Sequence, residues 1–153
     1  YMKVGFDGDF SNEELCDRIN AAFPPGYTLL VSKKLDGKEI DITKINRAEY
    51  IVETEYSGNF DIDAFMTNTS LIVMKKTKSG EKESDIRPYI YDMTVADKND
   101  TEIVFDMTLA IGNEYNLKPQ TVLDAMEKYT EGLKFGFSKL HRKNMTINGN
   151  AIL

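Results

Sequence analysis

A cluster of cationic side chains occupies the middle of the sequence, between residues 75 and 87. Five bases stand there against three acids, and the bases are Lys75, Lys76, Lys78, Lys82 and Arg87. Such clusters bind phosphates, because each neutralised phosphate releases condensed counterions. Tyr89 and Tyr91 follow directly, and exposed tyrosine rings stack on unpaired bases. The stretch predicts a phosphate-binding surface; the alternative is a solvated charged turn in which Asp85 pairs with Arg87 or a lysine.

A second pair of cations, Arg142 and Lys143, lies near the C-terminal end of the sequence. The two basic points form one patch only if the final strand lies beside the strand at residues 71–74. We name six candidate ligands for nucleic acid or phosphate: Lys76, Lys78, Lys82, Arg87, Arg142 and Lys143. Gly80, Asp85 and Pro88 are expected to be structural. Glycine allows backbone conformations that other residues avoid at a turn, and proline fixes the backbone there.

The composition is that of a globular protein without a cofactor of its own. The chain has 153 residues, of which 41% are hydrophobic and 29% charged, enough for one domain or two packed halves. No apolar run approaches the roughly 20 residues of a membrane span, so we expect a cytoplasmic protein with no membrane partner. One cysteine excludes an intrachain disulfide and an iron–sulfur cluster held by this chain alone. With His141 as the single histidine, neither a zinc site nor a catalytic residue is predicted.

The net charge of -6 is distributed unevenly along the chain. Residues 1–63 carry thirteen acids and seven bases, whereas residues 64–153 carry twelve of each. A uniformly acidic protein would repel nucleic acid. Here the second part of the chain is neutral, so it is able to present a local basic face.

Hydrophobic periodicity predicts the elements that must position these residues. Strands are expected at residues 1–6 and 27–35, with a helix at residues 11–23 that Ser11 and Glu14 open as a capping box. Further strands are expected at residues 46–56, 71–74, 89–95, 103–111 and 135–147. The strand at residues 71–74 is apolar on both faces, which predicts a central position. Helices are expected at residues 60–68 and after Pro119, and a polar turn at residues 77–84.

These elements predict an α+β fold of ferredoxin-like βαβ units, with helices packed on a mostly antiparallel sheet. Residues 1–44 are expected to form an incomplete first βαβ module. Residues 45–153 are expected to form a second ferredoxin-like module in the order β-α-β-β-β-α-β. In that module the strands at residues 89–95 and 103–111 are an inserted β-hairpin.

The segment around Asp85-Ile86-Arg87-Pro88 resembles the diagnostic stretch of the radical SAM-linked protein family, a domain of unknown function. The matching residues are Lys76, Lys78, Gly80, Lys82, Asp85, Ile86, Arg87, Pro88 and Ile90. Residues 15–24 and 116–119 resemble other parts of that family. Its usual opening motifs, Ser-His-Leu-Asp and Gly-Phe-Asn-Pro-His-Pro, do not occur in this chain, which begins at Tyr1. The resemblance therefore implies that an N-terminal segment is missing.

The resemblance and the basic loop together predict a function: a non-catalytic accessory module that works with a radical SAM protein and binds a partner or substrate, such as RNA, through that loop. S-adenosylmethionine and an iron–sulfur cluster would belong to that partner and not to this chain. Two alternatives remain open. In one, the chain is part of an enzyme whose catalytic residues lie in the missing segment and meet Asp85 and Arg87 in a cleft. In the other, it is a docking domain for the radical SAM partner.

Overall fold

The computed structural model describes four stretches of the chain: residues 4–5, 7–34, 41–77 and 80–152, with only the backbone at residues 76–77. The chain divides into two compact units, of which unit 1 spans Tyr1–Ile42 and unit 2 spans Thr43–Ile152. Each unit has its own elements and is described separately. Within the described stretches, no helix combines the length and the apolar character needed to cross a membrane.

Unit 1 contains one helix, α1 (Asn12–Ala22), and an extended return segment. The Ser11 hydroxyl accepts a hydrogen bond from the Glu14 amide at 3.1 Å, which is one half of the predicted capping box; the Glu14 carboxylate instead accepts from Arg18 at 2.8 Å. The predicted strand at residues 27–35 is wrong over its described part, because residues 27–34 join no ladder. Asn20 instead holds the segment, donating to the Leu29 carbonyl and accepting from the Leu29 amide. The other predicted strand, at residues 1–6, lies largely outside the described residues.

Replacing Ser11 by alanine tests the α1 cap. We expect the variant to lower the local stability of α1 by about 1 kcal/mol, the usual cost of losing an N-cap hydroxyl. Amide hydrogen exchange of residues 12–22 reports this local loss, while protection in unit 2 should stay unchanged. Ser32→Ala is the matched control, because the Ser32 hydroxyl donates to the Asn12 carbonyl from outside the helix. Equal protection of α1 in Ser11→Ala and wild type would contradict the assigned cap.

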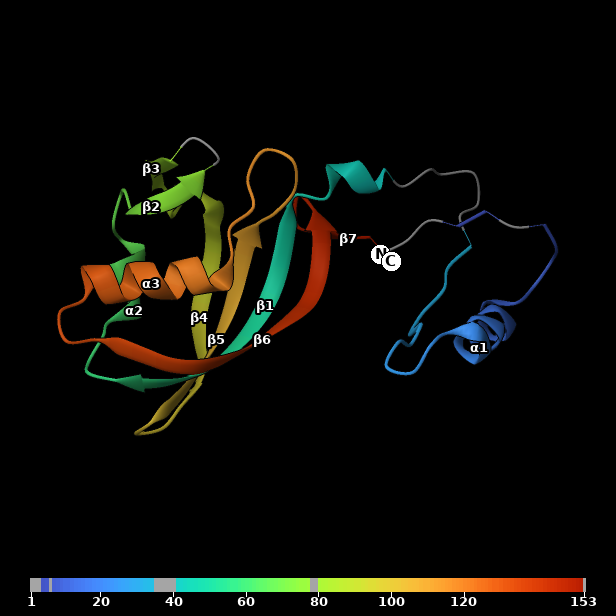
Figure 1. The fold of residues 1–153 in the computed structure, drawn as a ribbon, viewed down its shortest axis with the longest axis horizontal. Helices are drawn as coiled ribbons and strands as arrows, with labels where there is room; N and C mark the ends of the chain where they lie inside the picture. Colours follow the sequence, from blue (N-terminus) through green and yellow to red (C-terminus); the bar gives the residue numbers. More distant parts are fainter. Residues whose placement is uncertain (1–3, 6, 35–40, 78–79, 153) are drawn as a thin grey trace. The chain divides into compact units, whose positions relative to one another are not determined.

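Unit 2 is built on a five-stranded sheet in the order β4-β5-β1-β6-β7 (Figure 1). The strands are β1 (Arg47–Ser57), β4 (Ile90–Lys98), β5 (Glu102–Ala110), β6 (Lys134–Ile147) and β7 (Asn150–Ala151). All neighbouring strands are antiparallel. The alternating sequences of β1 and β5 explain their place at the centre, because each turns one apolar row to the same face. The α+β class predicted from the sequence is confirmed.

Two helices, α2 (Ile62–Met66) and α3 (Pro119–Tyr129), pack against one face of this sheet. The centre of the core is Phe105, which is fully buried and has the rings of Phe60 and Phe135 at 5.8 and 6.0 Å. Pro119 is the first residue of α3, and no side chain caps this helix. Proline is favoured at this position because the amide hydrogen that it lacks would have no partner in the first turn. The core fixes the ends of β1, β4 and β5, and these ends carry the candidate site.

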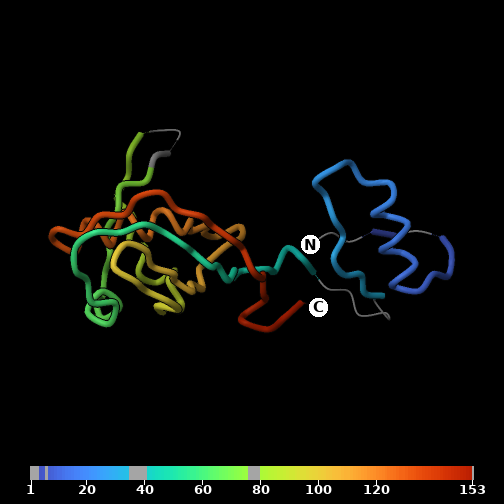
Figure 2. Tube along the Cα trace, turned by 90° about the horizontal axis from the view of Figure 1, so that it is seen from below, coloured from blue at the N-terminus to red at the C-terminus, as the bar shows by residue number. Residues whose placement is uncertain are grey.

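The strands β2 (Ile72–Thr77) and β3 (Gly80–Asp85) form a separate two-stranded hairpin, which we call the basic hairpin. Two predictions are therefore wrong: residues 71–74 are not a central strand of the main sheet, and residues 80–84 of the expected polar turn are a strand. Among the described side chains of the hairpin, the buried ones lie at its root, at Leu71, Val73 and Ile86, whereas Met74 is 54% exposed. Figure 2 shows the hairpin projecting from the rest of unit 2. The hairpin predicted at residues 89–111 is confirmed, because β4 and β5 are antiparallel neighbours, but it is part of the main sheet and not an insertion.

The final strand, β6, pairs with β1 and β7, so it does not lie beside β2. The condition for merging the two basic points into one patch is not met. Among the described strands, only the two-residue β7 pairs with the outer side of β6, at Thr146 and Ile147. Most of β6 is therefore an edge of the sheet.

Candidate nucleic-acid interface

Two cations face each other across the basic hairpin. Lys75 of β2 pairs in register with Lys82 of β3, on the same hairpin face as Val73 and Ser84. Like charges in directly opposed positions destabilise a strand pair. Within the described residues no ion pair joins either lysine to a carboxylate. An anion between the two ammonium groups would remove this repulsion. Of the other predicted hairpin ligands, Lys78 and the Lys76 side chain lie outside the described atoms.

An aromatic stack connects this face of the hairpin with the sheet. The Tyr115 and Tyr89 rings are parallel, with centroids 3.7 Å apart and an angle of 6° between their planes. The Lys75 ammonium lies 4.1 Å from the Tyr115 ring centroid, and the Ser84 and Tyr115 hydroxyls are 3.0 Å apart. Both contacts hold the stack against the hairpin. Lys75 of the basic cluster and Tyr89, which the sequence suggested as a stacking ring, therefore meet through Tyr115, whereas Tyr91 has its ring against Arg47.

Asp85 joins the root of the hairpin to the turn that follows it. Its Oδ1 atom accepts hydrogen bonds from the Leu71 amide at 2.8 Å and from the Arg87 amide at 3.0 Å. The bond from the Leu71 amide is the main reason that the pKa of Asp85 lies below its usual range, although partial burial opposes the shift,. Pro88 follows in a 3-10 turn at Arg87–Tyr89. Through these contacts Asp85 ties the backbone before β2 to the backbone after β3.

Arg87 is half-buried and directs its guanidinium to backbone carbonyls. Nε and Nη2 donate to the Met66 carbonyl at 3.1 and 2.8 Å, and Nη1 donates to the Ile90 carbonyl at 3.0 Å. Met66 is the last residue of α2, where helix carbonyls lack intrahelical partners and cations are favoured. Arg87 thus fastens α2 to the start of β4, and the Asp-Ile-Arg-Pro stretch acts as a corner of the fold.

The remaining candidates lie on β6. Arg142 and Lys143 are exposed and stand opposite the middle of β1, where Arg142 pairs with Tyr50. His141 is also exposed and pairs with Ile51. The structure does not bring these side chains to the basic hairpin.

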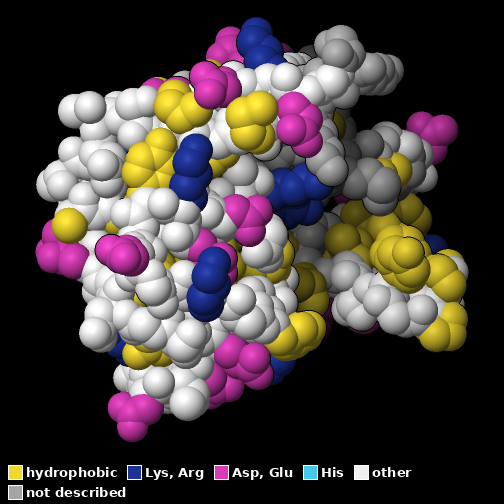
Figure 3. All heavy atoms as spheres, turned by 60° about the vertical axis from the view of Figure 1, so that its left-hand side comes forward, with side chains coloured by type: hydrophobic (Ala, Val, Ile, Leu, Met, Phe, Trp, Pro, Cys, Tyr) yellow, Lys and Arg dark blue, Asp and Glu magenta, His cyan; other side chains and the backbone are white. Residues whose placement is uncertain are grey.

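The sheet face opposite the helices is acidic. Ala48, Val52 and Thr54 of β1 are buried, so the intervening glutamates point to the other face. This face carries Glu49, Glu53 and Glu55 of β1, with Glu102 and Asp106 of β5 in the neighbouring strand. Arg47 and Lys139, which is paired with Glu53 at 3.7 Å, lie on the same face and leave an excess of acids. It would repel phosphates. On the face seen in Figure 3, cationic and anionic side chains are interspersed, so positive charge is local to small groups.

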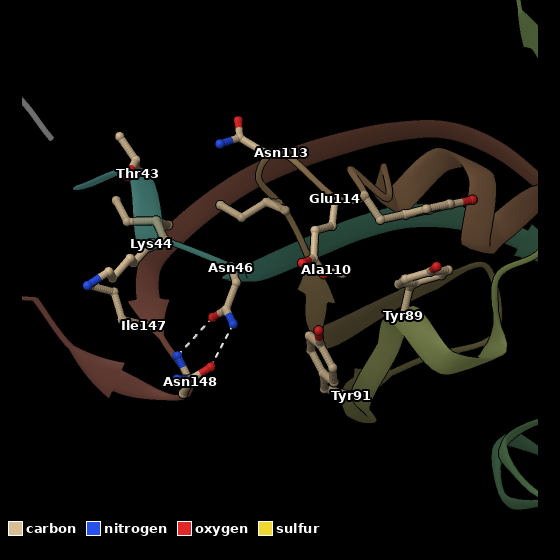
Figure 4. A pocket seen from close by; sticks show the side chains of 13 residues that line it. Thr43, Lys44, Asn46, Tyr89, Tyr91, Ala110, Asn113, Glu114, Ile147 and Asn148 are labelled. Atoms are coloured by element: carbon tan, nitrogen blue, oxygen red, sulfur yellow. Dashed lines mark hydrogen bonds between the residues drawn. The ribbon is translucent and has the colours of Figure 1, made fainter. Parts of the chain in front are cut away.

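A pocket of about 380 Å³ opens at the end of the main sheet, beside the stack (Figure 4). Its walls come from the start of β1, the end of β5, the residues before β4 and the loop after β5. The residues that line it and could contact a ligand are Lys44, Asn46, Tyr89, Tyr91, Asn113, Glu114, Tyr115 and Asn148. Sequence reasoning had found Tyr89 and Tyr91 but missed the asparagines and Glu114. The run of polar residues at 113–116 is a signal in the sequence that could have indicated the Glu114 side of the pocket.

The chain is an α+β protein whose cations and tyrosines meet at a projecting hairpin and at a pocket in the sheet end. It belongs to the family described as "Uncharacterized protein conserved in bacteria (DUF2344)", whose model matches residues 1–119. The match ends at the first residue of α3 and so covers unit 1 and most of the candidate interface. Neither the curated proteins nor the solved structures gave a match.

Proposed function

We propose that this chain is a non-catalytic accessory module that binds RNA through the basic hairpin. The observation that carries the proposal is the opposed pair Lys75 and Lys82, which adjoins the stacked rings of Tyr115 and Tyr89. Single-stranded nucleic acid is bound by cations, which follow the backbone, together with aromatic rings, on which bases stack. Tyr115 has Lys75 over one face and Tyr89 over the other, so a base would stack on the remaining face of Tyr89. The acidic face of the sheet directs a phosphate backbone to the hairpin side of the molecule.

Of the residues predicted as phosphate ligands, we retain Lys82 in this role and add Lys75, its partner across the hairpin. Arg87 is assigned to the corner of the fold, because its guanidinium already donates to two carbonyls. Asp85 is likewise occupied by backbone amides. These contacts favour a binding module over an enzyme in which Asp85 and Arg87 would line a catalytic cleft.

We infer further that unit 2 is a ferredoxin-like module with the basic hairpin inserted between α2 and β4. The support is the chain order β1-α2-β4-β5-α3-β6, combined with the strand order β4-β5-β1-β6 and antiparallel neighbours throughout. A split βαβ arrangement has this combination of features. In this view the hairpin is an addition to a common scaffold, and additions to scaffolds are frequent places for binding residues.

The double variant Lys75→Glu, Lys82→Glu tests RNA binding. We expect its affinity for a labelled single-stranded RNA to fall about tenfold or more at low salt, because two phosphate contacts are replaced by repulsion. The slope of log affinity against log salt should decrease in magnitude by about one to two. Fluorescence anisotropy between about 0.05 and 0.2 M salt measures both quantities.

The matched control is Arg142→Glu, Lys143→Glu, which makes the same change of net charge at exposed positions of β6, a strand that does not lie beside β2. Its affinity should stay within about twofold of wild type, since exposed charges beyond a Debye length of about 10 Å are screened. Equal losses in the two double variants, or no RNA bound by wild type at low salt, would overturn the proposal.

The radical SAM protein remains our proposed partner, and the support for it is the resemblance of the Asp85–Pro88 segment alone. A pull-down from bacterial lysate, with and without ribonuclease, distinguishes direct docking on the radical SAM protein from a link through RNA. Recovery of a radical SAM protein in both samples supports direct docking. Recovery only without ribonuclease would mean that RNA, and not a protein contact, joins the two.

A further inference from the structure

The pocket at the sheet end has two walls of preordered tyrosine. One face of the Tyr91 ring is covered by the Arg47 guanidinium, at 4.2 Å from the ring centroid, and the ring remains 40% exposed. Tyr89 has one face covered by Tyr115. Both rings line the pocket. Rings held in this way lose little conformational entropy when a ligand stacks on them, so they favour a planar ligand.

The opposite wall is a pair of asparagines fixed to each other. Asn46 Nδ2 donates to Asn148 Oδ1 at 2.6 Å, and the Asn148 amide donates to Asn46 Oδ1 at 2.8 Å. These two bonds leave the Asn148 side-chain amide group as a donor on a fixed frame. Figure 4 shows the pair across the pocket from Tyr89, with Glu114 extending between them. A planar ligand therefore meets a donor and a carboxylate acceptor at its edge.

From these walls we propose that the pocket holds one unpaired nucleobase that carries an exocyclic amino group. A carboxylate accepts a hydrogen bond from an amino group such as cytosine N4. Uracil presents its single N–H between two carbonyl oxygens, which the Glu114 carboxylate would repel. The volume of about 380 Å³ falls at the lower end of the range for small-ligand sites,. The pocket thus takes a single base and its sugar and discriminates against uracil.

This inference rests on the proposed function, because the hairpin supplies the phosphate contacts of the same strand. The stack of Lys75, Tyr115 and Tyr89 runs from the hairpin to the pocket. A strand with one base in the pocket therefore has its backbone within reach of Lys75 and Lys82. Hairpin and pocket have separate roles: the lysines provide affinity, and the pocket provides base selection.

Oligocytidine and oligouridine of about ten nucleotides are the probes for this inference, since both stack weakly and differ mainly at the base edge. We expect wild type to bind oligocytidine about tenfold more tightly than oligouridine near neutral pH, within the usual discrimination of a side chain–base hydrogen bond. Glu114→Gln should reduce this ratio toward one. The ratio is the readout because removing a negative charge also raises the affinity for both strands.

Tyr91→Ala separates stacking from phosphate binding. Its affinity for oligocytidine should fall about tenfold, the usual effect of losing one base–aromatic contact, with an unchanged salt slope. Both replaced residues lie at the surface, so the variants keep the core intact. Equal binding of the two oligonucleotides by wild type, with affinity still dependent on Lys75 and Lys82, would overturn the base pocket and leave the proposed function standing. Absence of binding by both would overturn both.

Discussion

The variant Arg87→Leu is expected to lower the free energy of unfolding of unit 2 by about 3 kcal/mol. Three hydrogen bonds from the guanidinium to the Met66 and Ile90 carbonyls are lost. A hydrogen bond to a charged group contributes about 1.5–3 kcal/mol net of its exchange with water. Because two of the three bonds share one carbonyl and Arg87 is half-buried, the total stays near the value of one or two such bonds. Urea unfolding followed by amide protection in β1, β4 and β5 measures the loss for unit 2 alone. Protection in α2 should fall most, because Arg87 holds its last carbonyl.

Two further variants make this result specific. Arg87→Lys keeps the charge but not the planar fork, so it should recover only part of the lost stability. Arg142→Leu removes an exposed arginine from β6 and should change stability by no more than about 0.5 kcal/mol. If Arg87→Leu were as stable as wild type yet lost RNA binding, Arg87 would be a phosphate ligand, as the sequence had suggested.

The second large effect is expected at Asp85, as a dependence of stability on pH. The Leu71 amide bond holds the pKa of Asp85 below its usual range in the folded protein, while the unfolded chain has a value of about 3.9. The ionised carboxylate therefore contributes its full stability above that unfolded value. The contribution is lost as the pH falls from about 5 through the folded pKa. Glu127 adds a loss in the same direction, because the Phe135 amide lowers its pKa.

Asp85→Asn should cost about 2 kcal/mol at neutral pH, since a charge-assisted acceptor of two amides becomes neutral. The difference from wild type should shrink as the pH falls, because the wild-type carboxyl then becomes neutral too. Urea midpoints between neutral pH and about pH 3 measure this convergence. Asp92→Asn, an exposed carboxylate on β4, is the control and should follow wild type at every pH. A constant difference between Asp85→Asn and wild type would contradict the role assigned to the charge.

The main sheet could be predicted because its strands bury one regular face. Met93 and Val95 of β4, and Ile103, Phe105 and Met107 of β5, are the alternating residues that the sequence shows and the core contains. The segment at residues 27–34 alternates less regularly, and its Leu30 side chain is 85% exposed. The apolar residues of this segment resemble those of a strand, but the segment is not buried and no neighbouring strand pairs with it,.

The basic hairpin could not be predicted, because its outer half has no apolar row. Lys75, Glu81 and Lys82 read as a solvated turn, yet cross-strand backbone bonds and the buried root at Leu71 and Ile86 hold them as strands. The pocket could not be predicted from the sequence for a different reason. Asn46 and Asn148 are bonded across 102 positions of the chain, and only the pairing of β1 with β5 and β6 brings them together. Local sequence patterns carry no information about a contact between residues so far apart in the chain.

The open edge of β6 bears on how the protein behaves in concentrated solution. A long strand with unpaired amides and carbonyls is a template on which a second chain can add, and lysines along such an edge oppose this self-association. Lys139, Arg142 and Lys143 are exposed along that strand. Salt screens their mutual repulsion. The same salt titration that releases RNA from the hairpin therefore also favours edge-to-edge aggregation, so each binding curve needs a light-scattering measurement at the same salt concentration.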